Sequence, residues 1–315
     1  MRQIVLVLFT LFFAACGSDH TNGIKSEEHV PRLVSIDAKR QGLGDYWYQG
    51  KAEISRYVLS QNRYREIHPG EAVLIFVTED FLTDKQVKND YYRNPNSVSI
   101  LKLNAIHRFA TGLYDYSVMT SVFTPVKLEQ YAHSLKVTNS SQDWCGQTFM
   151  QINAGKKNFK VRWFSYFEKE ADTQVDIPLG LLEDEVWTRL RVNPASLPTG
   201  EMAVMPAAAY FRLMHIDCKP YMAKAELMDY SGAEFSGKGL KTYRISYPEL
   251  RRTLDIVFEQ EPPYRIEGWK ETFPSLSDGV ERSTIGRRVN TLLTDYWKKN
   301  GTEFQALRRE FMLNQ

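Results

Sequence analysis

The stretch FKVRWFSYF, residues 159–167, shows the pattern that decides the fold. Its alternate positions Phe159, Val161 and Trp163 are apolar, and charged residues stand between them. A period of two is the pattern of a β-strand, in which successive side chains point to opposite faces. Aromatic residues occur at both sets of positions, so we expect neither face of this strand to be simply exposed to solvent.

The same alternation recurs along the chain. Residues 243–247, 254–258 and 264–266 repeat it, and turns that contain proline separate these three segments. Turn signals about every 8 to 12 residues are typical of antiparallel sandwiches and barrels. Aromatic residues make up 13% of the chain, which suits packing on a pleated surface. We expect roughly ten to twelve short strands.

One helix stands out in the interior of the chain. Leu182, Val186 and Leu190 are spaced four apart, and Asn193-Pro194 ends the pattern. The acidic residues 183–185 favour its N-terminal half through the helix dipole. The tail over residues 302–312 has near-helical spacing as well. The sequence therefore predicts a mainly β fold, an antiparallel barrel-like or curved sandwich arrangement with one interior helix and a helical C-terminal tail.

The N-terminus carries an export signal. Residues 1–15 combine a positive start, an apolar run and small residues before Cys16. The run is about ten residues long, whereas a membrane-spanning helix needs roughly 20. The cysteine directly after Ala14-Ala15 resembles the lipobox of bacterial lipoproteins, which implies that Cys16 is lipidated, with palmitate as a typical acyl group. A plain cleaved signal and an uncleaved anchor are the alternatives.

The remaining chain divides into a tether and a folded region. Residues 16–40 are polar without an apolar period, so we expect a flexible tether. Residues 41–315 form the predicted β-rich domain, with two lobes joined near residues 179–200. Gly17, rather than aspartate, follows Cys16, and the lipoprotein resemblance then implies an outer-membrane location in the cell envelope. The membrane is thus an expected partner through the lipid anchor.

Several function classes lack their signatures. The net charge is +2 with both signs interspersed, so no nucleic acid partner is expected. Neither GxxxxGK(S/T) nor GxGxxG nor HExxH nor GxSxG occurs, so we predict no nucleotide, metal or other cofactor and no catalytic residue. His215 and Asp217 would share one strand face, but a zinc site needs further ligands. We interpret them as a surface pair.

Two cysteines remain beyond Cys16. Cys145 and Cys218 are candidates for a disulfide, because an exported protein meets an oxidising environment. Two buried free thiols are the alternative, since free cysteine packs as a small apolar residue. A reactive thiol is the third interpretation, and it would need a histidine near Cys145.

Polar side chains flank a tryptophan in residues 141–147. Such a segment can stack on a ligand and orient it by hydrogen bonds, and aromatic residues of the 159–167 strand could supply further walls. The candidate ligand-binding residues are Gln142, Asp143, Trp144, Trp163, Phe164 and Tyr166. The alternative is a corner of the barrel interior, with Trp144 in the core.

Carboxylates offer a different hypothesis. Glu53, Glu79 and Asp143 would suit glycoside hydrolysis if two of them lay about 5–10 Å apart. Glu79 and Asp80 are adjacent on one strand and therefore point to opposite faces. Lys102 is a candidate partner for one carboxylate in an ordinary ion pair.

Several short strings together resemble an uncharacterised family of exported bacterial lipoproteins, whose members often carry the label septum formation inhibitor Maf. The strings are YWY at 46–48 with GKAEI at 50–54, GEAV at 70–73, TEDF at 78–81, QDWCG at 142–146, NP at 193–194 with LPTG at 197–200, and DYW at 295–297. The resemblance covers nearly the whole chain after the signal and implies no activity. Maf nucleotide pyrophosphatases have an SxRR phosphate-binding motif, which follows no first strand here, so no catalytic residue is carried over.

These observations favour a binding protein over an enzyme. We expect an envelope lipoprotein that binds an apolar ligand or another envelope protein, because aromatic residues on both strand faces could line a cavity. A hydrolase of envelope glycan or peptide and a structural assembly factor without a cavity are the alternatives. An apolar cavity, a cleft with paired carboxylates, or neither would distinguish the three.

Overall fold

The computed structural model of the chain describes residues 43–311. They belong to one compact unit, Asp37–Gln315. The predicted signal peptide, Cys16 and the tether lie outside the described residues. None of the helices within residues 43–311 combines the length and the apolar composition that crossing a membrane requires.

Strands dominate the fold, and the first half of the chain consists of eight of them. These are β1 (Ala52–Arg63), β2 (Glu66–Leu82), β3 (Ser97–Thr111), β4 (Tyr114–Pro125), β5 (Lys136–Asp143), β6 (Gly146–Ala154), β7 (Asn158–Ser165) and β8 (Thr173–Pro178). The second half adds β9 (Leu181–Leu182), β10 (Gly200–Met205), β11 (Tyr221–Asp229), β12 (Leu240–Tyr247), β13 (Arg252–Glu259), β14 (Ile266–Pro274) and β15 (Glu281–Thr294).

Helical segments are short. The α-helices are α2 (Glu183–Val192), α3 (Ala208–Met214) and α4 (Gln305–Glu310). The 3-10 turns are η1 (Asp45–Tyr48), η2 (Pro194–Ser196), η3 (Tyr296–Lys298) and η4 (Thr302–Phe304).

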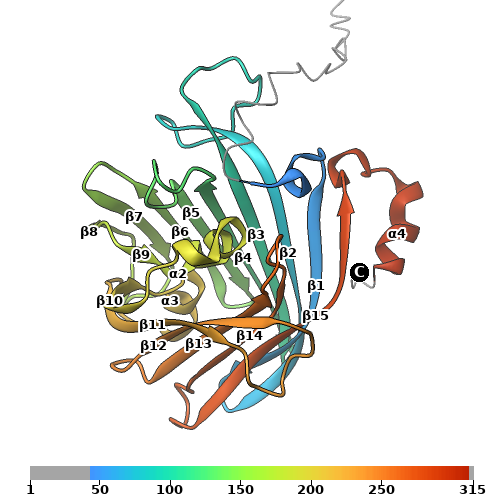
Figure 1. Cartoon of the computed structure of the whole chain (residues 1–315). Helices are drawn as coiled ribbons and strands as arrows, with labels where there is room; N and C mark the ends of the chain where they lie inside the picture. Colours follow the sequence, from blue (N-terminus) through green and yellow to red (C-terminus); the bar gives the residue numbers. More distant parts are fainter. Residues whose placement is uncertain (1–42, 312–315) are drawn as a thin grey trace, which may run out of the picture. The chain divides into compact units, whose positions relative to one another are not determined.

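All fifteen strands form one sheet in the order β8-β7-β6-β5-β4-β3-β2-β1-β15-β14-β13-β12-β11-β10-β9 (Figure 1). Neighbours are antiparallel except β9 and β10, which are parallel. The edge strands β8 and β9 follow each other in the chain with only residues 179 and 180 between them. Three Cα–Cα steps span at most about 11 Å, so the two edges lie close together at this end although the sheet is not closed.

Local irregularities in the sheet allow it to curl. The register shifts between Arg56 and Tyr57 on β1 and again between Val257 and Phe258 on β13. Such bulges bend a strand and increase its twist. On β15, Gly286 leaves room for the indole of Trp269, since a Cβ there would lie 2.3 Å from the ring. The missing side chain lets this large aromatic lie flat against the neighbouring backbone.

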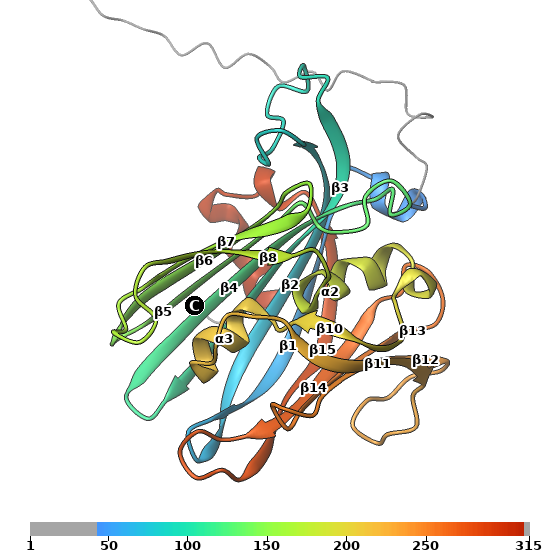
Figure 2. The same ribbon diagram turned by 90° about the vertical axis from the view of Figure 1, so that its left-hand side faces the viewer.

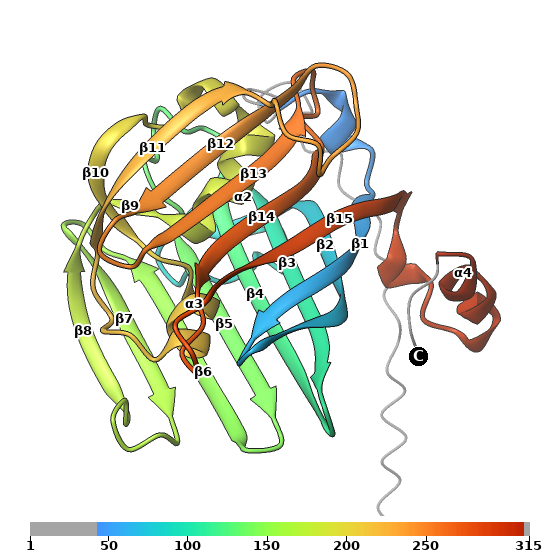
Figure 3. The same cartoon turned by 90° about the horizontal axis from the view of Figure 1, so that it is seen from below.

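The curled sheet wraps around α2 and α3, which lie on its concave side (Figures 2 and 3). α2 packs against β3 and β4, and α3 packs against β4 and β5. Inward-facing side chains of both halves of the sheet and apolar residues of the two helices form the main core. In contrast, α4 lies on the outside near β15, where Phe311 contacts a small cluster with Ile54 and Val73.

The predicted fold class is confirmed, as a mainly β antiparallel sheet with an interior helix and a helical tail. The sheet has more strands than the predicted ten to twelve, and a second interior helix, α3, was not predicted. α3 has only seven residues, too few for a helical period to stand out. Residues 179–200, where we expected two lobes to join, lead from the end of β8 through α2 to the start of β10.

Candidate functional site

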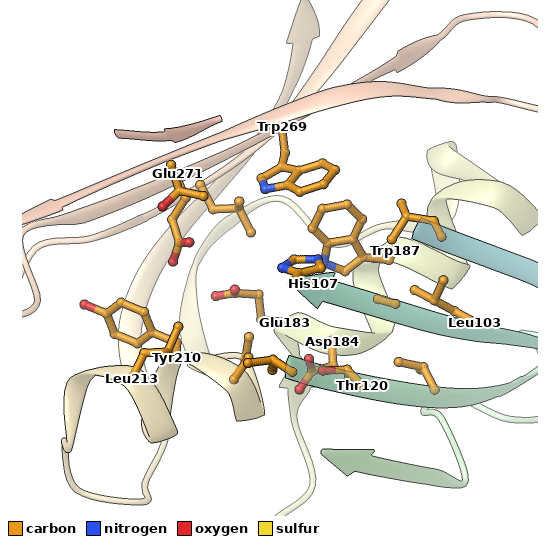
Figure 4. Close-up of a pocket in the computed structure, with 18 of the residues that line it drawn as sticks. Leu103, His107, Thr120, Glu183, Asp184, Trp187, Tyr210, Leu213, Trp269 and Glu271 are labelled. Carbon is orange, nitrogen blue, oxygen red and sulfur yellow. The ribbon is translucent and has the colours of Figure 1, made fainter. Parts of the chain in front are cut away.

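A cavity of about 90 Å³ lies between the concave face of the sheet and the helices α2 and α3 (Figure 4). Strands β2, β3 and β4 supply one wall, β13 and β14 the opposite wall, and the helices the rest. Most of the lining is apolar, and the apolar residues are Leu74, Leu103, Ala105, Val118, Val122, Trp187, Ala207, Ala209, Leu213, Leu254, Trp269 and Phe273. This cavity is the candidate binding site.

Trp269 organises the apolar part of the cavity. Its ring stacks on His107 with centroids 5.5 Å apart and meets Trp187 of α2 edge to face at 5.4 Å. Figure 4 shows these three rings together at one end of the cavity. Burial lowers the pKa of His107 to about 4, so the imidazole is neutral at pH 7 and acts as part of the aromatic wall.

The other end of the cavity carries a charged cluster of Glu183, Arg252 and Glu271. Arg252 donates from Nη1 and Nη2 to both oxygens of Glu183 at 2.5 and 2.6 Å, and from Nε to Glu271 at 2.6 Å. The Tyr247 hydroxyl donates to Glu183 at 2.7 Å. Bidentate pairing of this kind is the strongest form of charged hydrogen bond. Each of the three nitrogens of the Arg252 guanidinium therefore donates to a carboxylate.

Asp184 is the acid of the cavity for which no ion pair with a cation is seen among residues 43–311. It accepts a hydrogen bond at 2.9 Å from the backbone N–H of Ala208, where α3 begins. Burial raises the pKa of Asp184 to about 7, and the neighbouring Glu183 acts in the same direction. The carboxyl group therefore changes between neutral and charged near pH 7 and links α2 to α3.

A second buried ion pair fixes the far end of α2. Arg191 donates to both oxygens of Glu53 on β1 at 2.6 and 2.7 Å, and its Nε donates to the carbonyl of Pro263 at 2.9 Å. The guanidinium also lies over the rings of Trp47 and Phe76. Burial by itself would raise the pKa of Glu53, but Arg191 outweighs it and holds the pKa below its usual range.

The structure does not bring the six predicted ligand-binding residues together. Trp163 is 4% exposed and faces Phe211 of α3, whereas Phe164 is 48% exposed on the opposite face of the same strand. Adjacent strand residues point to opposite faces, so Trp163 and Phe164 cannot line one site. Trp144 and Tyr166 are 67% and 50% exposed, and Gln142 is exposed as well. Trp144 is consequently not a core residue either.

Asp143, the sixth predicted residue, has a structural set of partners. Its Oδ1 accepts from the backbone N–H groups of Cys145 and Gly146, and its Oδ2 accepts from Arg212 at 2.6 Å. It thus fixes the β5–β6 turn to α3.

The predicted disulfide is not formed in this structure, in which Cys145 and Cys218 are both free. Cys145 is exposed in the β5–β6 turn, and Cys218 lies partly buried against the main core. Burial raises the pKa of the Cys218 thiol to about 12. The interpretation as two buried free thiols is therefore correct in part only, for Cys218.

The three carboxylates considered for glycoside hydrolysis are each paired with a different cation. Glu53 binds Arg191, Glu79 binds Lys102 at 2.8 Å, and Asp143 binds Arg212. They do not form a free carboxylate pair.

His215 also differs from its expected place. It ends α3 in the left-handed region, with φ of 51°, and its Nδ1 lies 2.5 Å from Glu170. It is therefore not on a strand beside Asp217. Across residues 43–311, no three His, Cys, Asp or Glu side chains stand together in a way that could hold a metal ion.

Sequence reasoning missed the residues that line the cavity. No motif of the sequence singles out Trp187 or Trp269, and the acids at 183–185 were interpreted as the N-terminal half of a helix. Their partner Arg252 is far away in the chain, so no local pattern connects it to Glu183. The one usable signal was three consecutive acids beside an apolar helix stripe, which must meet cations when the stripe is buried.

Comparisons with protein-family models, with curated proteins and with solved structures found no match to this chain.

Proposed function

We propose that this protein is a lipid-anchored protein of the cell envelope that binds an apolar or amphipathic ligand between its curled sheet and the helices α2 and α3. The cavity around Trp269 carries the proposal, because it combines apolar walls with a few polar groups at one end. Ligand sites in proteins commonly have this composition.

The size of the cavity limits what fits without rearrangement. Its volume of about 90 Å³ is smaller than the roughly 150 Å³ apolar cavity that holds benzene in another protein. A ligand with a longer chain must therefore displace a helix, and α3 is the shorter of the two. We expect this seven-residue helix between two strands to move, since lids and loops commonly move when a ligand binds.

The test is a thermal-shift series on the purified full chain with single-chain amphiphiles and envelope lipids. A ligand at a hundredfold excess over its Kd should stabilise the fold by about 2.7 kcal/mol. Native purification followed by mass spectrometry of bound lipids provides an independent readout.

A pair of alanines on β3 supplies matched variants. Ala105 lines the cavity, whereas Ala110 on the same strand is exposed. Ala105→Met should fill the space and abolish the ligand-induced shift, and Ala110→Met should leave it intact. If no amphiphile shifts the melting temperature of any of these proteins, the cavity is not a binding site, and a structural assembly role takes its place.

A further inference from the structure

A second pocket, of about 230 Å³, lies on the other side of α3. It is lined by the ends of β1 and β14, the start of β4, the β5–β6 turn and residues 212–215. Leu213 and Phe273 line both this pocket and the cavity around Trp269. The two spaces therefore share a wall formed by one side chain of α3 and one of β14.

Arg63 brings a positive charge without a counter-ion into this second pocket. Its side chain is buried, and no carboxylate among residues 43–311 forms an ion pair with it. Its Nη1 donates to the carbonyl of Leu213 at 2.5 Å and its Nη2 to the Tyr116 hydroxyl at 3.3 Å, while its Nε has no acceptor among the described residues. The guanidinium lies over the Tyr64 ring, 4.6 Å from its centroid.

Arg212 adds further unmet donors. It is only 2% exposed, and Asp143 neutralises its charge through Nη2 alone. Its Nε and Nη1 have no acceptor within residues 43–311. A buried donor without a partner is unfavourable, because it has lost its bonds to water. Arg189, Arg265 and Arg288 each leave only the Nε unpaired, whereas Arg212 leaves two nitrogens unpaired and Arg63 of the same pocket leaves a third. This concentration of unpaired donors points to a ligand that accepts hydrogen bonds.

The other ionisable groups of the pocket do not cancel this charge. His215 is paired with Glu170, and Asp143 is already bound by Arg212 and by two backbone N–H groups. The pocket therefore holds one positive charge in excess, together with three guanidinium nitrogens that lack acceptors. A carboxylate or phosphate supplies both a negative charge and acceptor oxygens, and two of its oxygens can accept from neighbouring nitrogens of one guanidinium.

We infer that this pocket binds an oxyanion, a carboxylate or phosphate, which is the headgroup of the amphiphile whose chain occupies the cavity around Trp269. The inference rests on the proposed function, and Leu213 and Phe273 mark the passage between headgroup and chain. A cation would be repelled by Arg63, and a neutral headgroup could accept hydrogen bonds but would leave the Arg63 charge unbalanced.

Titration calorimetry on the full chain with four probes tests the inference. The probes are dodecyl phosphate, dodecanoate, dodecanol and inorganic phosphate. We expect dodecyl phosphate and dodecanoate to bind at least tenfold more tightly than dodecanol. Arg63→Met should remove this difference, Arg63→Lys should retain part of it, and Arg65→Met should retain all of it. Arg65 is an exposed arginine of the same turn and controls for the loss of one positive charge.

The outcomes separate the two proposals. Equal affinity for dodecanol and dodecyl phosphate overturns the oxyanion site and leaves the apolar cavity standing. Binding of inorganic phosphate alone, lost in Arg63→Met, supports the oxyanion site but overturns its link to an amphiphile and the proposed function with it. If Arg63→Met binds dodecyl phosphate as the wild type does, the inference is wrong.

Discussion

Arg191, Arg252 and Arg212 are buried to the same depth, and Arg63 in the lining of the second pocket is almost as deeply buried, yet the surroundings of these four arginines differ. Arg191 and Arg252 each pair with both oxygens of one carboxylate, and every nitrogen of their guanidinium groups has a partner. Arg63 and Arg212 together leave three nitrogens without an acceptor. Arg191 and Arg252 hold α2 against the sheet, whereas Arg63 and Arg212 line the second pocket.

The difference shows how one chain separates structural charges from functional ones. A buried charge costs several kcal/mol unless it is paired and hydrogen-bonded, so a buried arginine without a carboxylate partner calls for an explanation. Glu53 and Glu183 supply the negative charge and the acceptor oxygens for Arg191 and Arg252. We propose that a bound ligand supplies them for Arg63 and Arg212.

Breaking a satisfied pair should have the largest effect. Arg191→Met leaves Glu53 buried without its cation, and we expect a loss of about 3–5 kcal/mol in the free energy of unfolding. Urea denaturation of the variant and the wild type measures it. The double variant Glu53→Met with Arg191→Met should recover most of the loss, because no unpaired charge remains. If the double variant is as unstable as the single one, the cost comes from packing rather than from charge.

The pH dependence of Asp184 should come next in size. In the folded state Asp184 stays protonated up to about pH 7, whereas in the unfolded chain it ionises near pH 4. The folded state thus holds one more proton between these values, and this group's contribution is full below pH 4 and lost as the pH rises to 7. The slope is at most about 1.4 kcal/mol per pH unit.

Asp184→Asn removes this slope and can still accept from the Ala208 N–H. The measurement is the difference in unfolding free energy between the variant and the wild type at pH 4.5, 6 and 7.5, which should move in favour of the variant. Glu183, Glu185 and Arg252 influence Asp184 and are unchanged in both proteins. Parallel profiles would mean that Asp184 is not protonated in the folded state.

Much of the fold could be predicted from the periodicity of apolar residues in the sequence. Residues 159–167 gave β7, the alternating segments from 243 to 266 gave β12, β13 and the start of β14, and the 182–190 spacing gave α2. Polar strands were harder. β5 has the sequence KVTNSSQD, and β15 carries three arginines, so neither shows a clean apolar face. β15 becomes a strand because it pairs with β1 and β14, and β1 lies more than 200 residues away in the chain.

The candidate site could hardly be predicted from the sequence, because it depends on which strands and helices face each other in the fold. Trp163 was predicted to line a ligand site, but it faces α3, whereas Trp269 lies where the sheet and the helices leave space. Trp144 was a candidate because of its polar neighbours, and Phe164 and Tyr166 because aromatic residues occur on both faces of their strand. Neither pattern shows which side chains the rest of the chain covers. Whether a buried arginine finds acceptors for its N–H groups likewise depends on residues far away in the chain.

Removal of an incompletely satisfied arginine should change stability little. Arg63→Met takes away a buried cation and its unmet Nε donor, and it gives up the bonds to Leu213 and Tyr116 together with the cation–π contacts on the rings of Tyr64 and Tyr116. We therefore expect a change within about 1 kcal/mol of the wild type, since these losses and gains are of similar size. Urea denaturation without added ligand measures it beside Arg191→Met. A loss of 3 kcal/mol or more in the free energy of unfolding would mean that Arg63 stabilises the fold as Arg191 and Arg252 do.

The two thiols provide the finest test, because only one of them lies at the incompletely satisfied pocket. Cys145 is exposed and lines that pocket, whereas Cys218 is partly buried and its pKa is raised to about 12. The thiolate is the reactive form, so a maleimide at pH 7.5 should modify Cys145 much faster than Cys218. Peptide mapping by mass spectrometry resolves the two sites.

Dodecyl phosphate should slow the modification of Cys145 in the wild type and in Arg65→Met but not in Arg63→Met, because the bound headgroup covers the pocket. Modification of both cysteines only after reduction would instead reveal a disulfide, and unchanged rates with dodecyl phosphate would separate Cys145 from the ligand site.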